Sequence, residues 1–392
     1  MKITGISAIC LKYPCKTIIA DGCTPCLNRM SVLIRIDTDT ELYGIGEAAT
    51  FGGNMQAMKI LVEKQLAHLL IGEDPLNIEF LWNKMAWNNW ASGRHGMVMG
   101  AISGIDIALW DLLGKAANMP LYQLLGANSS KVPTYASAGF YAENKTIDDL
   151  KREMEKYRAM GFTAYKMKIG RTKDLVNSPL RYMNGGDHTI SFDEDVRRIA
   201  AVREAIGPSA RLMVDMNCTW DTDSVIANKD LFDAYNIYWV EEPSRNDDAH
   251  GYVRIAQALG KTLVAGIESE QGLGRFTELI EMGALDVVQL NIGWSGGITE
   301  SRKIAAVALA HNKLFAPHTF FSGVLNAANA HFAASLTNVP FIEYELNENP
   351  LRTELLKEPL ILDSDMQIHL TDKPGLGIDV DWEQVDKYFC KD

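Results

Sequence analysis

From about residue 130 onward, short apolar segments typical of β-strands alternate with amphipathic segments typical of α-helices, and this alternation constrains the fold most strongly. The apolar segments are VPTYASAGF, AYKMKI, RLMVDMN, NIYWVEEP, TLVAGIES, DVVQLN, KLFAPH and PFIEYE. Strands that alternate with helices favour a parallel sheet. Eight such repeats predict an α/β fold, namely a TIM-like (β/α)8 barrel or a large variant of one.

The two ends of the chain do not follow this alternation. Residues 2–11 and 31–37 are typical of strands, and residues 97–117 are typical of a long helix with an apolar stripe. Strands followed by a helix indicate an α+β arrangement. The tail is expected to return to this N-terminal part. The predicted division is 1–128 as an N-terminal α+β domain, 129–360 as the barrel and 361–392 as the returning tail.

The composition excludes some classes of partner. The 392 residues carry a formal net charge of −12 and give a pI of about 5.2, which argues against nucleic acid or an anionic membrane. We expect no membrane-spanning stretch and find no signal-peptide layout in MKITGISAICLKYPC. Six cysteines are few, and Cys23 and Cys26 lack the second pair of ligands that a zinc site needs. We therefore expect a cytoplasmic protein with reduced thiols.

Polar residues stand at the C-terminal ends of the predicted barrel strands. From Asp215 onward they follow one another at steps of 26, 27, 23, 27 and 25 residues, which is one strand–helix unit per step. All strand C-termini of such a barrel meet at one mouth, where active sites lie, so these side chains are expected to converge. They are Lys166, Lys168, Asp215, Asn217, Glu241, Glu268, Asn291, His318 and Glu343.

Three consecutive strands supply the carboxylates of Asp215, Glu241 and Glu268. Three oxygen ligands from separate strands, without cysteine or histidine among them, suit Mg²⁺ rather than zinc. The alternative is that these carboxylates pair with lysines across the mouth. We favour the metal site because the three acids recur at a regular period.

A divalent cation beside a lysine pair suits proton abstraction. A metal that binds a substrate carboxylate stabilises the enediolate formed when the α-proton leaves. Lys166 and Lys168 are two residues apart on one strand and face the same way. A lysine near another cation loses proton affinity, so Lys166 is expected to tune Lys168 as a base. His318, from the far side of the barrel, is expected to transfer a proton on the opposite flank.

The chain resembles the enolase superfamily, specifically its mandelate racemase and muconate lactonizing enzyme subgroup. The resemblance rests on AISGIDIALWDLLGKAANMPLYQLLG, KMK, VDMN, WVEEP, AGIES, GGIT, PHTF, FIEY and PGLG, which extend over nearly the whole chain. It implies a modified barrel under an N-terminal capping domain completed by the C-terminal tail. It also implies a small hydroxy acid or sugar acid as substrate, and a homo-oligomer between dimer and octamer. The implied roles are Mg²⁺ on Asp215, Glu241 and Glu268, Lys168 as base, Lys166 as its modulator, and Asn217 and Glu343 as polar contacts to the substrate or intermediate.

One position departs from the family pattern. The family usually has an aspartate at the end of the sixth strand, paired with the histidine of the seventh, and here Asn291 stands there. An asparagine orients the ring of His318 but adds no charge, so His318 should be a poorer base and a readier acid. This favours dehydration of an aldonic or aldaric acid to a 2-keto-3-deoxy acid over racemisation, which needs two bases of similar strength.

Two other functions stay open. A racemase, epimerase or sugar-lactone cycloisomerase would use the same lysine and metal site. A ligand-binding barrel that has lost activity belongs to a different class, and the complete set of lysines, carboxylates and histidine argues against it. Substrate selectivity is expected in the loops at 16–30 and 50–58 and in a polar insertion at 172–189.

Overall fold

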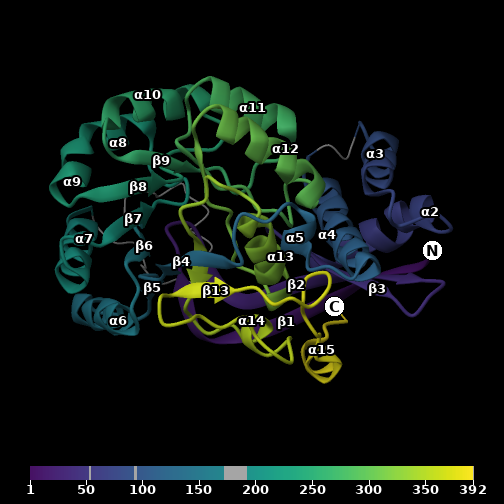
Figure 1. The fold of residues 1–392 in the computed structure, drawn as a ribbon. Coiled ribbons are helices and arrows are strands. Elements are labelled where there is room, and N and C mark those ends of the chain that lie inside the picture. Colours follow the sequence, from purple (N-terminus) through teal and green to yellow (C-terminus); the bar gives the residue numbers. More distant parts are fainter. Residues whose placement is uncertain (53, 92–94, 172–191, 392) are drawn as a thin grey trace.

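The computed structural model describes residues 1–52, 54–91, 95–171 and 192–391 (Figure 1). The predicted insertion at 172–189 therefore lies outside the described residues. All eight predicted barrel strands are present and parallel, and they pair in the order β11-β10-β9-β8-β7-β6-β4-β12. Among the described residues no strand pairing joins β11 to β12. The strands are β4 (Lys131–Ser137), β6 (Ala164–Lys168), β7 (Arg211–Asp215), β8 (Ile237–Glu241), β9 (Leu263–Gly266), β10 (Val287–Val288), β11 (Leu314–Phe315) and β12 (Ile342–Glu345).

Helices cover the outside of this sheet, as Figure 1 shows for α6 to α12. The first of them starts at a capping box between Thr146 and Asp149 and ends at Gly161, whose φ of 114° is the left-handed conformation that glycine adopts easily. The helices are α6 (Ile147–Met160), α7 (Phe192–Ile206), α8 (Thr222–Ala227), α9 (Lys229–Ala234), α10 (Ala249–Leu259), α11 (Leu273–Glu281), α12 (Gly297–Ala310) and α13 (Gly323–Ala334).

Apolar side chains fill the centre of the barrel in one layer, to which each strand or its immediate flank contributes one residue. Within it the rings of Tyr135 and Trp239 pack edge to face at 5.7 Å. A filled interior leaves room for a site only above this layer, at the carboxyl ends of the strands. The layer consists of Tyr135, Ala164, Met213, Trp239, Ala265, Val287, Ala316 and Phe341.

The N-terminal part forms the expected α+β arrangement. Its antiparallel sheet has the order β3-β2-β1-β5 and packs against the long helix α4. Strand β3 and helix α4 pack so closely that a Cβ on Gly46 would lie 2.3 Å from the carbonyl oxygen of Gly104 in the helix. The elements are β1 (Ile3–Ala20), β2 (Pro25–Thr38), β3 (Tyr43–Ala48), β5 (Tyr141–Ala142), α1 (Met55–Ile60), the π-helical turn η1 (Leu61–Leu66), α2 (Ala67–Leu70), α3 (Ile78–Asn88), α4 (Met97–Ala117) and α5 (Leu121–Leu124).

Helix α4 corrects one expectation from the sequence. By length and composition Met97–Ala117 is apolar enough to cross a membrane, contrary to our prediction that no stretch would be. The helix lies inside the protein instead, with 89% of its most apolar window buried. A core helix of this length passes the same test as a membrane span, because both are long and rich in apolar residues.

The C-terminal tail runs back across the molecule. Its elements are α14 (Pro350–Thr353), β13 (Gln367–His369) and α15 (Trp382–Tyr388). Strand β13 pairs with β4, and the amide of Cys390 donates to the carbonyl oxygen of Cys10 in β1 at 2.9 Å. The tail thus contacts both the barrel and the N-terminal sheet. The exact domain boundaries remain predictions.

Strand β5 joins the N-terminal sheet to the barrel mouth. It follows the first barrel strand directly, and Tyr141 and Ala142 pair with Ala20 and Ile19 at the end of β1. The turn between β1 and β2 is closed by the Asp21 amide, which donates to the carbonyl oxygen of Thr24 at 3.1 Å. Through this pairing the β1–β2 hairpin is anchored beside the strand ends that carry the predicted site.

Candidate active site

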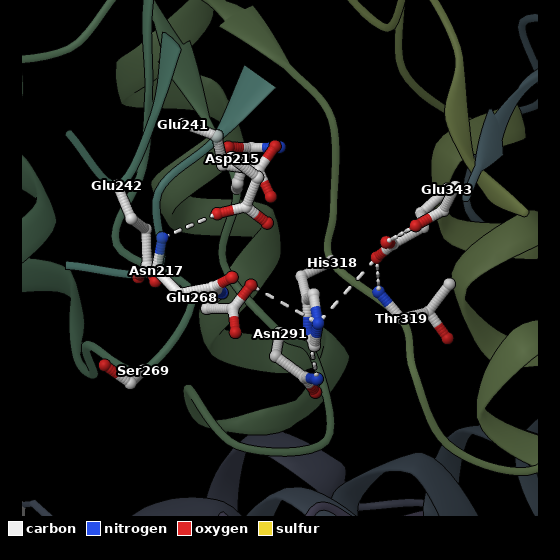
Figure 2. A network of polar contacts seen from close by, with 12 residues as sticks. Asp215, Asn217, Glu241, Glu242, Glu268, Ser269, Asn291, His318, Thr319 and Glu343 are labelled. Atoms are coloured by element: carbon white, nitrogen blue, oxygen red, sulfur yellow. Dashed lines mark hydrogen bonds and ion pairs between the residues drawn. The ribbon is translucent and has the colours of Figure 1, made fainter. Parts of the chain in front are cut away.

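The predicted site residues occupy the inward positions just above the apolar layer. Asp215 stands two residues after Met213 and Glu241 two residues after Trp239, so each acid faces the same side as the apolar residue below it. Figure 2 shows the resulting convergence of side chains from β7 to β12. The same spacing relates Ala164 to Lys166, Ala316 to His318 and Phe341 to Glu343.

The backbone turns sharply where three of these strands end. Asn217 after β7, Glu242 after β8 and Ile267 after β9 have φ angles of 44°, 41° and 68°. Non-glycine residues rarely adopt this left-handed conformation, and such residues concentrate at functional sites. Because the chain turns at Ile267, Glu268 stands three residues after Ala265 of the apolar layer rather than two. Its carboxylate points toward His318, whose Nε2 lies 3.3 Å from Glu268 Oε2.

The two lysines are buried and paired with carboxylates. Lys166, only 1% exposed, contacts Glu241, and its Nζ lies 3.1 Å from Glu343 and 3.5 Å from Asp215. Lys168 contacts Asp215. The alternative considered from the sequence, that the acids pair with the lysines, therefore describes this arrangement.

The buried acids of the site form two groups, one with raised and one with lowered pKa values. Burial and the neighbouring Asp215 raise the pKa of Glu241 to about 8, and burial together with Glu242 raises the pKa of Glu268 strongly. Burial also raises the pKa values of Asp215 and Glu343, but the lysine ammonium groups lower them by more. The pKa of Asp215 is therefore lowered, and that of Glu343 falls to about 2.

The pKa of Lys168 is set by its charged neighbours. Burial and Lys166 both lower it, but contact with the carboxylate of Asp215 outweighs them and the net pKa is raised. The expectation of a lysine that acts as a base near neutral pH was made for a site with a divalent cation, so it stays a prediction. Lys168 can become that base only when another cation takes over the charge of Asp215.

His318 is held by Asn291 in a defined orientation. The backbone N–H of Gly293 donates to Asn291 Oδ1 at 2.9 Å, so the Asn291 amino group faces His318 Nδ1 at 3.0 Å. Because that amino group is a donor, Nδ1 must accept, and the ring hydrogen belongs on Nε2. Burial also favours the neutral ring and lowers the pKa of His318 to about 4. Nε2 points toward Glu268 and Glu343, at 3.3 and 3.7 Å (Figure 2).

These groups open into a cavity of about 630 Å³ under the β1–β2 hairpin. Lys168, Asn217, Glu268, His318 and Glu343 line it from the barrel. The structure adds lining residues that the strand-end pattern did not mark, because most lie on the hairpin or on loops far away in sequence. They include Asp21, Arg29, Phe140, Glu242 and Phe320.

Arg29 is the buried cation of the cavity roof. Its Nη2 lies 3.1 Å from Glu345 Oε1, its Nε donates to the carbonyl oxygen of Glu348, and its guanidinium lies over the ring of Phe320. Glu345 is shared with Arg352, at 2.8 Å. Arg29 Nη1 is buried without a hydrogen-bond partner among the described residues.

The donor set at the barrel mouth fits a magnesium ion. Asp215, Glu241 and Glu268 offer only oxygen ligands, and burial together with neighbouring acids raises the pKa values of the two glutamates. Asn217 Oδ1 is buried without a partner in the described structure. Within the described ranges no three acids already stand in ligating geometry. We attribute this to Lys166 and Lys168, which hold two of the three carboxylates.

A second and larger cavity, of about 1070 Å³, lies between α3 and α11. His95 and Trp90 line it, but none of the predicted site residues does. Size alone would favour this cavity as the active site. The convergence of buried charged groups favours the smaller one.

The sequence matches two family descriptions. Residues 18–126 match "Mandelate racemase / muconate lactonizing enzyme, N-terminal domain", and residues 149–385 match "Enolase C-terminal domain-like". The first match covers most of the N-terminal sheet and helices, and the second covers the barrel from α6 onward together with most of the tail.

Named relatives cover nearly the whole chain. Arabinonate dehydratase of Saccharolobus solfataricus is 33% identical over 360 residues, which are 92% of this chain and 91% of the relative. D-galactarolactone cycloisomerase of Agrobacterium fabrum is 32% identical over the full length of both proteins. The crystal structure of a racemase from Streptomyces coelicolor A3(2) with bound magnesium superimposes with a TM-score of 0.86 at 30% identity, covering 99% of this chain and 100% of that one.

Proposed function

Because the chain belongs to the enolase superfamily, within its mandelate racemase and muconate lactonizing enzyme group, we propose that it dehydrates a sugar acid. The substrate would be an aldonic or aldaric acid and the product a 2-keto-3-deoxy acid. The observation that carries this proposal is the convergence of Lys168, Glu268 and His318 on one cavity, with the carboxylate of Asp215 in contact with Lys168.

Lys168 is proposed to remove the α-proton through its Nζ. A Mg²⁺ ion on Asp215, Glu241 and Glu268 would neutralise the carboxylate that now raises the lysine pKa, and would stabilise the negative charge on the substrate carboxylate. Lys166 stays bound between Glu241 and Glu343 and keeps positive charge next to Lys168, which further favours the neutral base.

His318 is proposed to act on the opposite flank through its Nε2–H. Asn291 keeps the hydrogen on that nitrogen, so the ring can donate a hydrogen bond to the β-hydroxyl oxygen as its bond to carbon breaks. The proton that Lys168 has taken from the α-carbon would then pass to the departing oxygen, so that the substrate loses one water. A neutral ring with a pKa near 4 is a weak base. It is therefore poorly suited to take the α-proton from the second face, as racemisation requires.

The roof of the cavity is proposed to select hydroxylated substrates. Arg29 Nη1 is a buried donor without a partner in the described residues, and Arg29 and Arg352 share the single carboxylate of Glu345. A hydroxyl or carboxylate oxygen at the far end of the substrate would supply the missing acceptor.

A second candidate is the ring opening of a sugar lactone by a cycloisomerase. It is favoured by the same neutral His318, because a carboxylate leaving group departs without needing a proton, whereas a hydroxyl group does need one. The full-length similarity to D-galactarolactone cycloisomerase supports this candidate.

One assay separates these reactions. The magnesium-loaded protein would be incubated with aldonic acids, aldaric acids and their lactones, and the products analysed by mass spectrometry and a 2-keto acid assay. Dehydration lowers the product mass by one water and yields a 2-keto acid, whereas cycloisomerisation leaves the mass unchanged. A product epimeric at the α-carbon would contradict both. No turnover of any compound would favour the inactive ligand-binding barrel.

The surroundings in which the enzyme works are also a proposal. We propose a cytoplasmic homo-oligomer that acts on a small soluble acid, without nucleic acid or membrane as partner. The acidic pI and the six free cysteines support this view. Light scattering of the purified protein measures the oligomeric state directly.

A further inference from the structure

Two cysteines of the cavity roof lie within contact distance of each other. Cys15 in β1 and Cys26 in β2 place their sulfur atoms 3.8 Å apart. The pairing of the two strands shifts between Pro14, opposite Asn28, and Ile19, opposite Cys26, so β1 carries extra residues at this point. That irregularity brings Cys15 beside Cys26, although the regular register would not pair them.

The same two thiols differ in pKa. Hydrogen bonding with Cys26, and to a smaller degree the charge of Arg29, lowers the pKa of Cys15 to about 7, while the pKa of Cys26 is raised. Burial raises the pKa of Cys23 to about 11. Both Cys15 and Cys26 are partly exposed. A low-pKa, accessible thiol next to a second thiol is the arrangement of a peroxide-reactive cysteine with its resolving partner.

We propose that Cys15 and Cys26 form an oxidisable dithiol in the roof of the cavity. The Cys15 thiolate attacks one oxygen of hydrogen peroxide, the O–O bond breaks, and with one proton a sulfenic acid and one water result. The sulfur of Cys26 then attacks the sulfenic sulfur, the S–O bond breaks, and a second water leaves with the Cys26 proton. Two thiols and one peroxide thus give one disulfide and two waters, and a dithiol reductant reverses the change.

The site is part of the cavity wall and independent of the reaction proposed above. Cys26 lines the cavity that also holds Lys168 and His318. A disulfide needs the two sulfurs at about 2.05 Å, so oxidation draws the Cys26 side chain toward β1.

The test is a peroxide titration of the full-length protein. We expect two of the six thiols to be lost, and restored by dithiothreitol. Trypsin cleaves after Lys12, Lys16 and Arg29, so Cys15 lies in peptide 13–16 and Cys26 in peptide 17–29. These two peptides should be joined by a disulfide in the oxidised protein.

Variants assign the roles of the two thiols. Cys23→Ser, the matched control, should still form the linked peptides, which then contain only Cys26 as partner. In Cys26→Ser the sulfenic acid should persist on Cys15 and be trapped by dimedone. Linkage through Cys23, or loss of no thiol in the wild type together with no dimedone adduct on Cys15 in Cys26→Ser, would overturn the proposal.

Discussion

Replacing Asn291 by aspartate tests how the partner of His318 sets its chemistry. In the structure the Asn291 amino group donates to Nδ1 at 3.0 Å, because Gly293 fixes the amide oxygen on the other side. A carboxylate in the same place would accept a hydrogen bond from a protonated Nδ1. It would therefore favour the charged ring that the amide disfavours.

The size of the effect follows from the distance. Two unit charges about 4 Å apart interact by about 4 kcal/mol at an effective dielectric constant of 20. The Gly293 amide and the nearby acids offset part of this. We therefore expect the pKa of His318 to rise by about 1–3 on the pH scale, the usual effect of an adjacent opposite charge. A base whose pKa has risen by this much should abstract a proton about tenfold faster, because only part of a change in pKa appears in the rate of proton transfer.

The assay is deuterium incorporation at the α-carbon from the His318 side of a bound acid, measured by NMR in D₂O with Mg²⁺. Asn291→Asp should raise this exchange about tenfold over the wild type. The double variant Asn291→Asp, His318→Asn is the control, and it should lose the gain. Unchanged exchange in Asn291→Asp, or a gain that survives in the double variant, would refute the role assigned to Asn291.

Three further outcomes are expected. Lys166→Met should destabilise the protein by about 3–5 kcal/mol in urea unfolding without metal, because the buried Glu241 and Glu343 lose their partner; a change below about 1 kcal/mol would contradict this. Arg29→Met should lower kcat/KM about 10–100-fold, mainly through KM, for substrates with a polar far end; equal loss for truncated acids would speak against a substrate contact. Burial lowers the pKa of His331 to about 4, so its contribution to stability is complete above the unfolded pKa of about 6.5 and is lost as pH falls toward 4. Between pH 7 and pH 5 it should cost about 2 kcal/mol, which His331→Gln should abolish in paired unfolding curves.

The barrel and the convergence of its polar residues were predictable from local patterns. Each strand has its own apolar run, and Asp215 and Glu241 end theirs two residues above Met213 and Trp239. Parallel strands in a barrel share one direction, so this information suffices to bring the acids together. The family match supports the same architecture.

The electrostatic state of the site was not predictable in this way. Whether Lys168 is a base depends on the opposing effects of Lys166, which lowers its pKa, and of Asp215, which raises it. Spacing along the sequence says which side chains meet but not which carboxylate each ammonium group selects. The pattern of the strand ends therefore leaves the pKa of Lys168 open, although it brings the side chains together.

The segment at 16–30 was expected to take part in substrate selectivity and does line the cavity, but its contacts escaped prediction for a different reason. Arg29 pairs with Glu345, which is 316 residues away, and Cys15 meets Cys26 through a shift in strand register. Neither contact leaves a periodic signal in the sequence, because the first depends on how the hairpin packs on the barrel and the second on an irregular strand pairing. For Asn291, the family pattern marked the position, but the direction of its amide required the position of the Gly293 N–H.

In the proposed reaction, Lys168 removes the α-proton of a hydroxylated acid bound at the barrel mouth. The most direct measurement follows that proton by NMR in D₂O with Mg²⁺, using an acid that the wild-type protein turns over. Lys168→Ala should lose at least about 10²-fold in the rate of α-proton loss, with the fold verified by its unfolding curve. α-Proton loss at the wild-type rate in this variant would show that another group is the base.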